Sequence, residues 1–395
     1  MLIYRRNALM SGKRLPYDAE VEYLESTGTQ YILLPANNYD GVDIMLEPAS
    51  GSTYGNIGRR TGTRADSICF DTTMGWAFRA YSSLTKTNDT NRSLRHATVH
   101  GTTATLDGVS YTLANGWNTV AFANKPFALF GLFNPSTQVM FAYVSCKIGA
   151  CALYVGSEKV YDFISVRKGT VGYLYDRVSG KLFGNAGTGD FVLGQDVVPV
   201  EYIESHGTEY IDTGFKASNS TRVAADFEST NSTVNRWILG ARNGAATATD
   251  KFALFYGNSS YAMIGSAMGE FSGATIKTGR HLLDMSLAGG VVVDSQIVAT
   301  YSASEQAEVF SAAYAMVLFN LWNGSLNSPF IGRYYACKFW DNGNPVRKFL
   351  PVRVGTDATS WEGAMMDVLT RRIYRNAGTG AFGYGNDLKY PIPAS

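Results

Sequence analysis

Short segments in which apolar and polar residues alternate recur along the chain and predict β-strands. Clear examples are 104–106, 119–122, 222–227 and 290–294, some of which run apolar for several residues, as buried strands do. Dipeptides typical of tight hairpin turns separate such segments: Asp107-Gly108, Asn115-Gly116, Gly257-Asn258, Asn323-Gly324 and Asn342-Gly343. Strands spaced in this way predict an all-β sandwich or barrel.

Sequences that favour a helix are scarce. The nearest candidates are 304–313 and 361–370, and both are short. The 41 glycines, 24 tyrosines, 21 phenylalanines and 6 tryptophans suit strands and turns better than helices. With 395 residues, the chain is too long for one ordinary core and about right for two domains.

An internal repeat shows how these domains are related. Residues 21–32 return as 200–211 with nine of twelve positions identical, and the Asn-Ala-Gly-Thr-Gly segment at 185–189 returns at 376–380. Between these ends, weaker matches keep the same order: Gly58-Arg59 with Gly240-Ala241-Arg242, Arg95-His96 with Arg280-His281, Phe133-Asn134 with Phe319-Asn320, and Cys146-Lys147 with Cys337-Lys338. Two diverged copies of one module explain both the order and the drifting offset.

The repeat predicts the domain boundaries. We expect an N-terminal tail at 1–18, a first β-sandwich at 19–194, a second at 198–387 and a C-terminal tail at 388–395. The linker between the modules is short. Each module is long enough for a jelly roll with extra strands.

Charge and cysteine content exclude several classes of protein. The formal net charge of +1 offers no basic field for nucleic acid or an anionic membrane, and no apolar run approaches the length of a membrane span. Four cysteines without a CxxC pair and only four histidines predict buried free thiols and no zinc site. The first residues do not read as a secretory signal, which predicts a protein made in the cytoplasm.

The opening 201–214, Glu-Tyr-Ile-Glu-Ser-His-Gly-Thr-Glu-Tyr-Ile-Asp-Thr-Gly, together with the closing Asn-Ala-Gly-Thr-Gly segments, resembles concanavalin A-like or laminin-G-like modules. The resemblance covers nearly all of both repeats. Such modules are frequent in proteins of gut bacteria and their phages, and they mostly bind glycans or build adhesins and virion appendages. The first copy departs from the pattern at Leu33-Leu34-Pro35, where the second has Asp212-Thr213-Gly214.

Aromatic residues near turns are the candidates for sugar stacking, although a place in the core is the alternative for each. The candidate carbohydrate-binding residues are Trp76, Tyr81, Trp117, Tyr256, Tyr261 and Trp322. Calcium is an open alternative as a cofactor, with oxygen ligands from two loops: Asn37, Asn38 and Asp40 in the first copy, and Asp341, Asn342 and Asn344 in the second. Turn formation would explain the same residues.

Catalysis has little support. Asp226 and Glu228 could share one face of a strand, but the first copy lacks this pair, and Glu22 and Glu25 are spaced for opposite faces. The glycine-rich segment 184–189 superficially resembles a phosphate loop, but a strand-like segment follows it, so a tight turn is favoured. We therefore expect no enzyme activity, no catalytic residues and no resident metal.

The N-terminal tail has no counterpart before the second copy. It mixes apolar and basic residues, and it could either add a strand to the first module or dock on another subunit through Ile3, Tyr4, Arg5, Arg6 and Leu9. The expectation that follows is a phage virion structural protein, a fibre or decoration protein, whose modules attach to glycans of the host surface. The alternatives are a bacterial surface adhesin and a glycan-cleaving enzyme. A homo-oligomer stays open.

Overall fold

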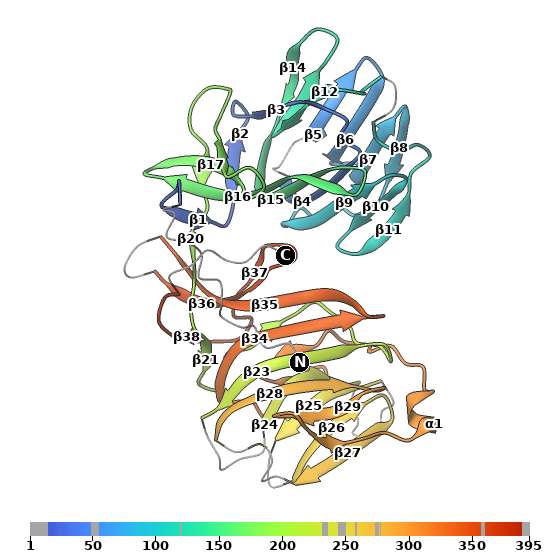
Figure 1. Ribbon diagram of the computed structural model, residues 1–395, viewed down its shortest axis with the longest axis vertical. Helices are drawn as coiled ribbons and strands as arrows, with labels where there is room; N and C mark the ends of the chain where they lie inside the picture. Colours follow the sequence, from blue (N-terminus) through green and yellow to red (C-terminus); the bar gives the residue numbers. More distant parts are fainter. Residues whose placement is uncertain are drawn as a thin grey trace. The chain divides into compact units, whose positions relative to one another are not determined.

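The described residues of the computed structural model fold into two all-β sandwiches, as the sequence predicts, with one short helix (Figure 1). Inter-residue contacts divide the described residues into two units, one of 15–197 with Thr370–Arg372 and one of Val198–Leu369 with 373–388, and each module is described by itself. The structure describes residues 15–48, 55–118, 121–230, 236–243, 250–256, 259–272, 276, 278–356 and 360–388.

Module 1 consists of a larger and a smaller sheet. The larger sheet contains β1 (Ala19–Val21), β2 (Leu24–Thr27), β4 (Gly41–Pro48), β9 (Arg95–His100), β10 (Thr103–Leu106), β11 (Val109–Thr112), β15 (Ser145–Val155), β16 (Glu158–Lys168), β17 (Val171–Asp176), β18 (Lys181–Phe183) and β19 (Val192–Leu193). The smaller sheet contains β3 (Ile32–Asn37), β5 (Gly55–Thr61), β6 (Arg64–Asp71), β7 (Gly75–Tyr81), β8 (Ser83–Lys86), β12 (Lys125–Leu129), β13 (Gly131–Asn134) and β14 (Val139–Tyr143).

Module 2 repeats this arrangement. Its larger sheet contains β21 (Ile203–Ser205), β23 (Arg222–Ser229), β28 (Gly279–Ser286), β29 (Gly290–Val293), β30 (Gln296–Ala299), β34 (Gly332–Asp341), β35 (Asn344–Gly355), β36 (Glu362–Asp367), β37 (Arg372–Tyr374) and β38 (Gly383–Tyr384). Its smaller sheet contains β22 (Ile211–Asp212), β24 (Arg236–Ala241), β25 (Phe252–Tyr256), β26 (Ser259–Ile264), β27 (Ala267–Ser272), β31 (Val317–Leu318), β32 (Leu321–Trp322) and β33 (Leu326–Asn327). The helix α1 (Ala303–Gln306) precedes β31.

The strands of the two modules correspond one to one in chain order over the described residues. In the larger sheets, the neighbouring strands β9–β4–β15 of module 1 correspond to β28–β23–β34 of module 2. In the smaller sheets, four successive antiparallel strands, β5 to β8, correspond to β24 to β27. Each smaller sheet also has one parallel contact at the equivalent place, β13 with β5 and β32 with β24. The duplication therefore extends to details of topology.

Strand register corrects two of the residue pairs that the sequence suggests. Cys146 corresponds to Gly332, because both lie opposite the serine of the opening repeat, and Cys337 corresponds to Cys151 instead. Likewise Arg95 corresponds to His281 and not to Arg280, since each binds the aspartate at the start of the following hairpin turn. A shift of one residue turns a side chain to the other face of a strand, so sequence similarity alone cannot determine the register.

The phenylalanines and arginines of the repeat are shifted as well. Phe319 corresponds to Phe130 and not to Phe133, since both have φ near +66°. The carbonyl of Phe130 accepts the Val144 N–H, and the carbonyl of Phe319 accepts the Phe330 N–H. Arg59 corresponds to Ala241, and Arg242 corresponds to the arginine after Arg59. The β-bulges at the starts of β5 and β24 align these strands.

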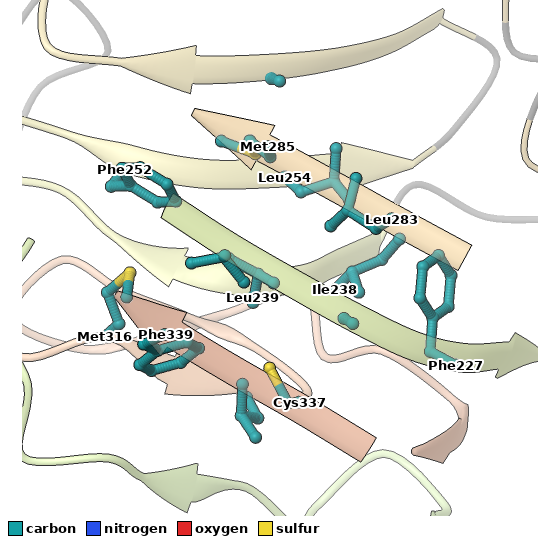
Figure 2. Packing of buried hydrophobic residues seen from close by; sticks show 14 of the residues in the cluster. Phe227, Ile238, Leu239, Phe252, Leu254, Leu283, Met285, Met316, Cys337 and Phe339 are labelled. Atoms are coloured by element: carbon teal, nitrogen blue, oxygen red, sulfur yellow. The ribbon is translucent and has the colours of Figure 1, made fainter. Parts of the chain in front are cut away.

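Each module has its own hydrophobic core between the sheets. Figure 2 shows this core in module 2, where Phe227, Leu283 and Phe339 of the larger sheet face Leu239 and Leu254 of the smaller sheet. The alternation along β23 explains the packing, because every second side chain of Arg222–Ser229 is buried.

Two of the predicted hairpin turns close with left-handed residues. Asp107 and Gly108 have φ of +46° and +86°, and Asn342 and Gly343 have +49° and +77°. Positive φ at both central positions matches the twist of antiparallel strands, and Gly or Asn adopts it at little cost. These dipeptides therefore join β10 to β11 and β34 to β35 as predicted.

Other expectations about secondary structure were wrong. The candidate helix at 361–370 contains β36 (Glu362–Asp367) instead, since pairing with β35 outweighs the helix propensity of its methionines. The short helix α1 overlaps the other candidate, 304–313, only at 304–306. Phe122, predicted in a strand, lies buried in a turn beneath the Arg59 guanidinium, and 119–120 lie outside the described residues. A strand, β20 (Asp196–Pro199), begins within the expected linker, where Asp196 and Val197 pair with β1.

Candidate functional site

Three of the six predicted carbohydrate-binding aromatics lie in the cores. Trp76, Trp117 and Tyr256 are 0%, 5% and 4% exposed. The indole N–H groups of Trp76 and Trp117 donate to the carbonyls of Asn91 and Arg79 at 2.7 and 2.8 Å. A buried ring whose N–H is already bonded offers no face to a sugar, so these three residues are corrected to core positions.

The other three candidates are half-buried and have distinct surroundings. Tyr81 has a φ of +56°, and the Arg64 guanidinium lies 4.7 Å from its ring centroid. Trp322 stacks on Tyr210, with centroids 6.4 Å apart and planes 27° apart. Tyr261 lies on the face of the smaller sheet that is turned away from the core. The structure does not bring these three side chains together.

The outer face of the smaller sheet of module 2 carries an aromatic row. Cross-strand pairs place Trp237, Phe255, Tyr261 and Glu270 in line across β24 to β27. The Tyr261 and Phe255 rings stack at 4.6 Å, and the Trp237 ring meets Phe255 edge-on at 4.7 Å. These rings form an apolar cluster separate from the core, in which Trp237 and Phe255 are buried and Tyr261 is half-buried. The further members are Ala253, Met263 and Leu321. We call this surface the aromatic face.

Charged groups border the aromatic face. The Arg242 guanidinium lies 5.5 Å from the Trp237 ring centroid, and Lys251 lies one strand away from Arg242. Burial, with the positive charge of Arg242 beside it, lowers the pKa of Lys251, while burial raises the pKa of Tyr261. Glu270 is exposed at the end of the row. The face therefore combines stacked rings with donors and an acceptor at its border, the groups that recognise a polar ligand with an apolar side.

The same positions in module 1 hold different residues. Gly55, Cys69, Ala77 and Lys86 stand in line across β5 to β8 where module 2 has its aromatic row. Burial raises the pKa of the Cys69 thiol to about 11, so this thiol stays protonated and unreactive. The modules share their strands but differ completely along this row, which makes the aromatic face specific to module 2.

A second polar group is specific to module 1. On the larger sheet, His100 Nε2 lies 2.6 Å from Asp43 Oδ1, and the Tyr154 hydroxyl donates to Asp43 Oδ2 at 2.9 Å. Burial tends to raise the pKa of Asp43, but the bonds from His100 and Tyr154 outweigh it and lower that pKa. The bond to Asp43 raises the pKa of His100. Module 2 has Ala224 in place of Asp43.

This ion pair predicts a pH dependence. The stability that protonated His100 contributes is fully present below about pH 6.5, its unfolded pKa, and is lost as the pH rises through the raised folded pKa. His100 is 44% exposed, so we expect a contribution of only about 0.5 kcal/mol. Urea unfolding of wild type and His100→Gln should differ at pH 6 and converge at pH 9. A difference that grows with pH would contradict the assignment.

The carboxylates of Asp226 and Glu228, the pair considered for catalysis, are bound by neighbouring side chains. Arg280 donates to both carboxylate oxygens of Asp226 at 2.7 Å and lies over the Tyr335 ring. The carboxylate of Glu228 accepts from the Tyr335 hydroxyl at 2.5 Å and from Arg333 at 3.4 Å. Both carboxylates are therefore engaged by neighbouring side chains on the sheet surface.

The glycine-rich segments form equivalent closing turns. Asn185 Oδ1 accepts the N–H groups of Tyr31 and Gly187, and Asn376 does the same for Tyr210 and Gly378. A Cβ on Gly187 would meet the carbonyl oxygen of Thr29 at 2.0 Å, which explains the glycine. The element that follows each turn is a strand, β19 or β38, and not a helix, so the phosphate-loop alternative fails and a structural role is favoured.

The loop residues considered for calcium have other partners. Asn37 and Asn38 accept backbone N–H groups, and Asp40 accepts the Gly156 N–H. Asp341 accepts the hydroxyls of Ser218 and Ser220. Asn342 and Asn344 bond within the turn. Among the described side chains, no three His, Cys, Asp or Glu residues form a group suited to a metal.

The predicted anchor residues Ile3, Tyr4, Arg5, Arg6 and Leu9 lie outside the described residues. All four cysteines are free and buried, as predicted. No helix in the described part of the chain is both long enough and apolar enough to cross a membrane.

Comparison with known proteins gives a fold neighbour and no family. No family model matches the chain, and no curated protein matches it. Among solved structures, domains LG4-5 of the mouse laminin α1 chain match with 11% identity, over 88% of this chain and 97% of that chain, at a TM-score of 0.29. A likeness this distant carries no argument about family or ligands. An origin in phage or gut bacteria stays a prediction.

Sequence reasoning named Tyr261 but missed its neighbours Trp237 and Phe255. One signal was present: 252–256 is apolar at five consecutive positions, which is typical of a strand buried on both faces. In a two-sheet sandwich only one face of a strand packs in the core, so such a run predicts a second apolar cluster on the other face of the sheet. The aromatic face is that cluster.

Proposed function

We propose that the chain is a non-enzymatic attachment protein whose modules bind carbohydrate or another polar surface. One observation carries this proposal: the two modules share their described strands, yet module 2 has a half-buried tyrosine, Tyr261, stacked on buried rings and bordered by charges where module 1 has alanine. A surface that diverges on a constant scaffold is where recognition is usually located. Tyr261 is the central contact in this proposal, with Arg242 and Glu270 at its border.

Tyr261→Ala should weaken binding to the recognised glycan about tenfold or more, because the ring that would stack on the sugar is removed. The measurement is a glycan array with the full chain, followed by titration of each positive glycan. Tyr384→Ala is the matched control, since Tyr384 is 40% exposed on β38 of the larger sheet. Equal binding by Tyr261→Ala and wild type would remove the aromatic face from the proposal.

The more specific proposal is that the modules are displayed on a virus particle, with the N-terminal tail as anchor and other virion proteins as partners. Its support is the tandem of lectin-like modules together with the apolar and basic tail. Mass spectrometry of purified particles from the source tests it. Recovery of the protein from the surface of uninfected cells, and not from particles, would favour the adhesin alternative.

The proposed absence of catalysis has its own test. Incubation of the full chain with the glycans that it binds should release no new reducing ends over a day. Cleavage that is lost in Asp226→Asn or Glu228→Gln would overturn it and identify a glycan-cleaving enzyme.

A further inference from the structure

A buried ion pair in module 1 holds together loops from separate parts of the chain. Arg59 and Asp66 are both fully buried, with Arg59 Nη2 at 3.3 Å from Asp66 Oδ2. They lie opposite each other on β5 and β6. In module 2 the same cross-strand positions hold Ala241 and Phe252, which pack in the core. The sandwich therefore folds without an ion pair at this place, and its role in module 1 is additional.

The arginine binds three carbonyls at the loop end of module 1. Arg59 Nη2 donates to the Tyr39 carbonyl at 2.8 Å, and Nη1 donates to those of Lys125 and Asn37 at 3.2 and 3.4 Å. Tyr39 in turn donates its hydroxyl to the Pro35 carbonyl at 2.7 Å, within the strand where the first copy departs from the second. One guanidinium thus ties the β3–β4 connection to the start of β12.

The aspartate binds two more segments. Asp66 Oδ2 accepts the Asn118 N–H at 2.9 Å, and Oδ1 accepts the Tyr81 N–H at 3.3 Å. Asn118 follows Trp117, the core tryptophan that has no counterpart in module 2. Asn118 Oδ1 and Arg59 Nε are buried without a hydrogen-bond partner among the described residues. Burial tends to raise the pKa of Asp66, and the positive charge of Arg59 opposes this.

The segments held in this way expose polar side chains. Asn38 and Asn124 are exposed and joined by a bond from the Asn124 N–H to Asn38 Oδ1 at 2.7 Å, while Asp40 and Lys125 are half-buried beside them. Amides, one carboxylate and one ammonium make a surface suited to a hydroxyl-rich, uncharged ligand. We infer that Arg59 and Asp66 are positioning residues that pre-form a polar binding surface at the loop end of module 1. This inference rests on the proposed attachment function.

The test replaces the ion pair by the pair that module 2 uses. In the full chain, Arg59→Ala with Asp66→Phe should fold, and amide exchange at Asn118 and Tyr81 should become at least tenfold faster while Ile68 on β6 is unchanged. The reason is that these two N–H groups lose the Asp66 carboxylate as their acceptor, and the loop carbonyls lose the hydrogen bonds from Arg59. Unchanged exchange at Asn118 and Tyr81 would overturn the positioning role, because the loops would then be held by other contacts.

A second arm concerns the surface itself. On an array of neutral oligosaccharides, signals that persist in Tyr261→Ala should fall at least tenfold in the double variant and in Asn38→Ala. Persistence of these signals in both variants would overturn the loop end as a binding surface. Exchange is measured on the free protein, so the absence of any wild-type binding would instead count against the proposed function alone.

Discussion

Arg59→Ala is expected to destabilise module 1 by about 3–5 kcal/mol, because it leaves the Asp66 carboxylate buried without its countercharge. Asp66→Phe alone should be similarly damaging, since it leaves a buried guanidinium. The double variant should lose less stability than either single variant, because no uncompensated charge is left buried, and its remaining loss comes from the backbone groups that the pair bonded. The contrast between single and double changes is the decisive part.

Urea unfolding followed by hydrogen exchange of peptides from each module measures this, since two modules need not unfold in one step. The strands of module 2 serve as the internal control and should keep the wild-type midpoint. Additive losses in the double variant would show that the two side chains act independently, and the buried pair would then not be a coupled unit.

Phe130→Ala and Phe319→Ala should each cost their own module about 3–5 kcal/mol, and by similar amounts. Both rings are fully buried. The Phe130 ring meets Phe191 at 4.7 Å, and the Phe319 ring meets Phe382 at 5.0 Å, so each packs on the phenylalanine that follows its closing turn. Removal of either ring leaves a cavity at the place where the sandwich is closed.

Thermal unfolding, followed by hydrogen exchange of peptides from each module, measures the loss of stability in each module separately. Val309→Ala is a control, since this side chain is 84% exposed and its loss should be within experimental error. A large effect from Phe319→Ala with a negligible one from Phe130→Ala would show that these residues are not structural counterparts.

The opening and closing repeats are recognisable in the sequence because the fold constrains them through backbone contacts. Gly187 and Gly378 cannot accept a Cβ, and Asn185 and Asn376 each bond two backbone N–H groups, so these residues persisted in both copies. Between the repeats, the core requires only apolar side chains of suitable size. Residue identities there diverge while the strands are retained. The residue pairs that the sequence suggests, such as the one with Arg95, are therefore displaced by one or a few positions.

The candidate sites were less predictable for a related reason. Sequence alone does not distinguish a tryptophan such as Trp76, which is enclosed by the core, from a ring on an outer face. Tyr261 is among the candidates that the sequence offers, but its stacking on Phe255 depends on cross-strand register. The Arg59–Asp66 pair depends on register as well, and its loop partners lie far away in sequence. Such sites become visible only when strands are paired.

A crystal structure of the full chain tests the duplication most directly. Superposition of module 1 on module 2 should match β2–β19 with β21–β38 strand for strand, placing Phe130 on Phe319 and Cys151 on Cys337, with Arg59 on Ala241. A different strand order in either module, or Cys146 superposed on Cys337, would contradict the account.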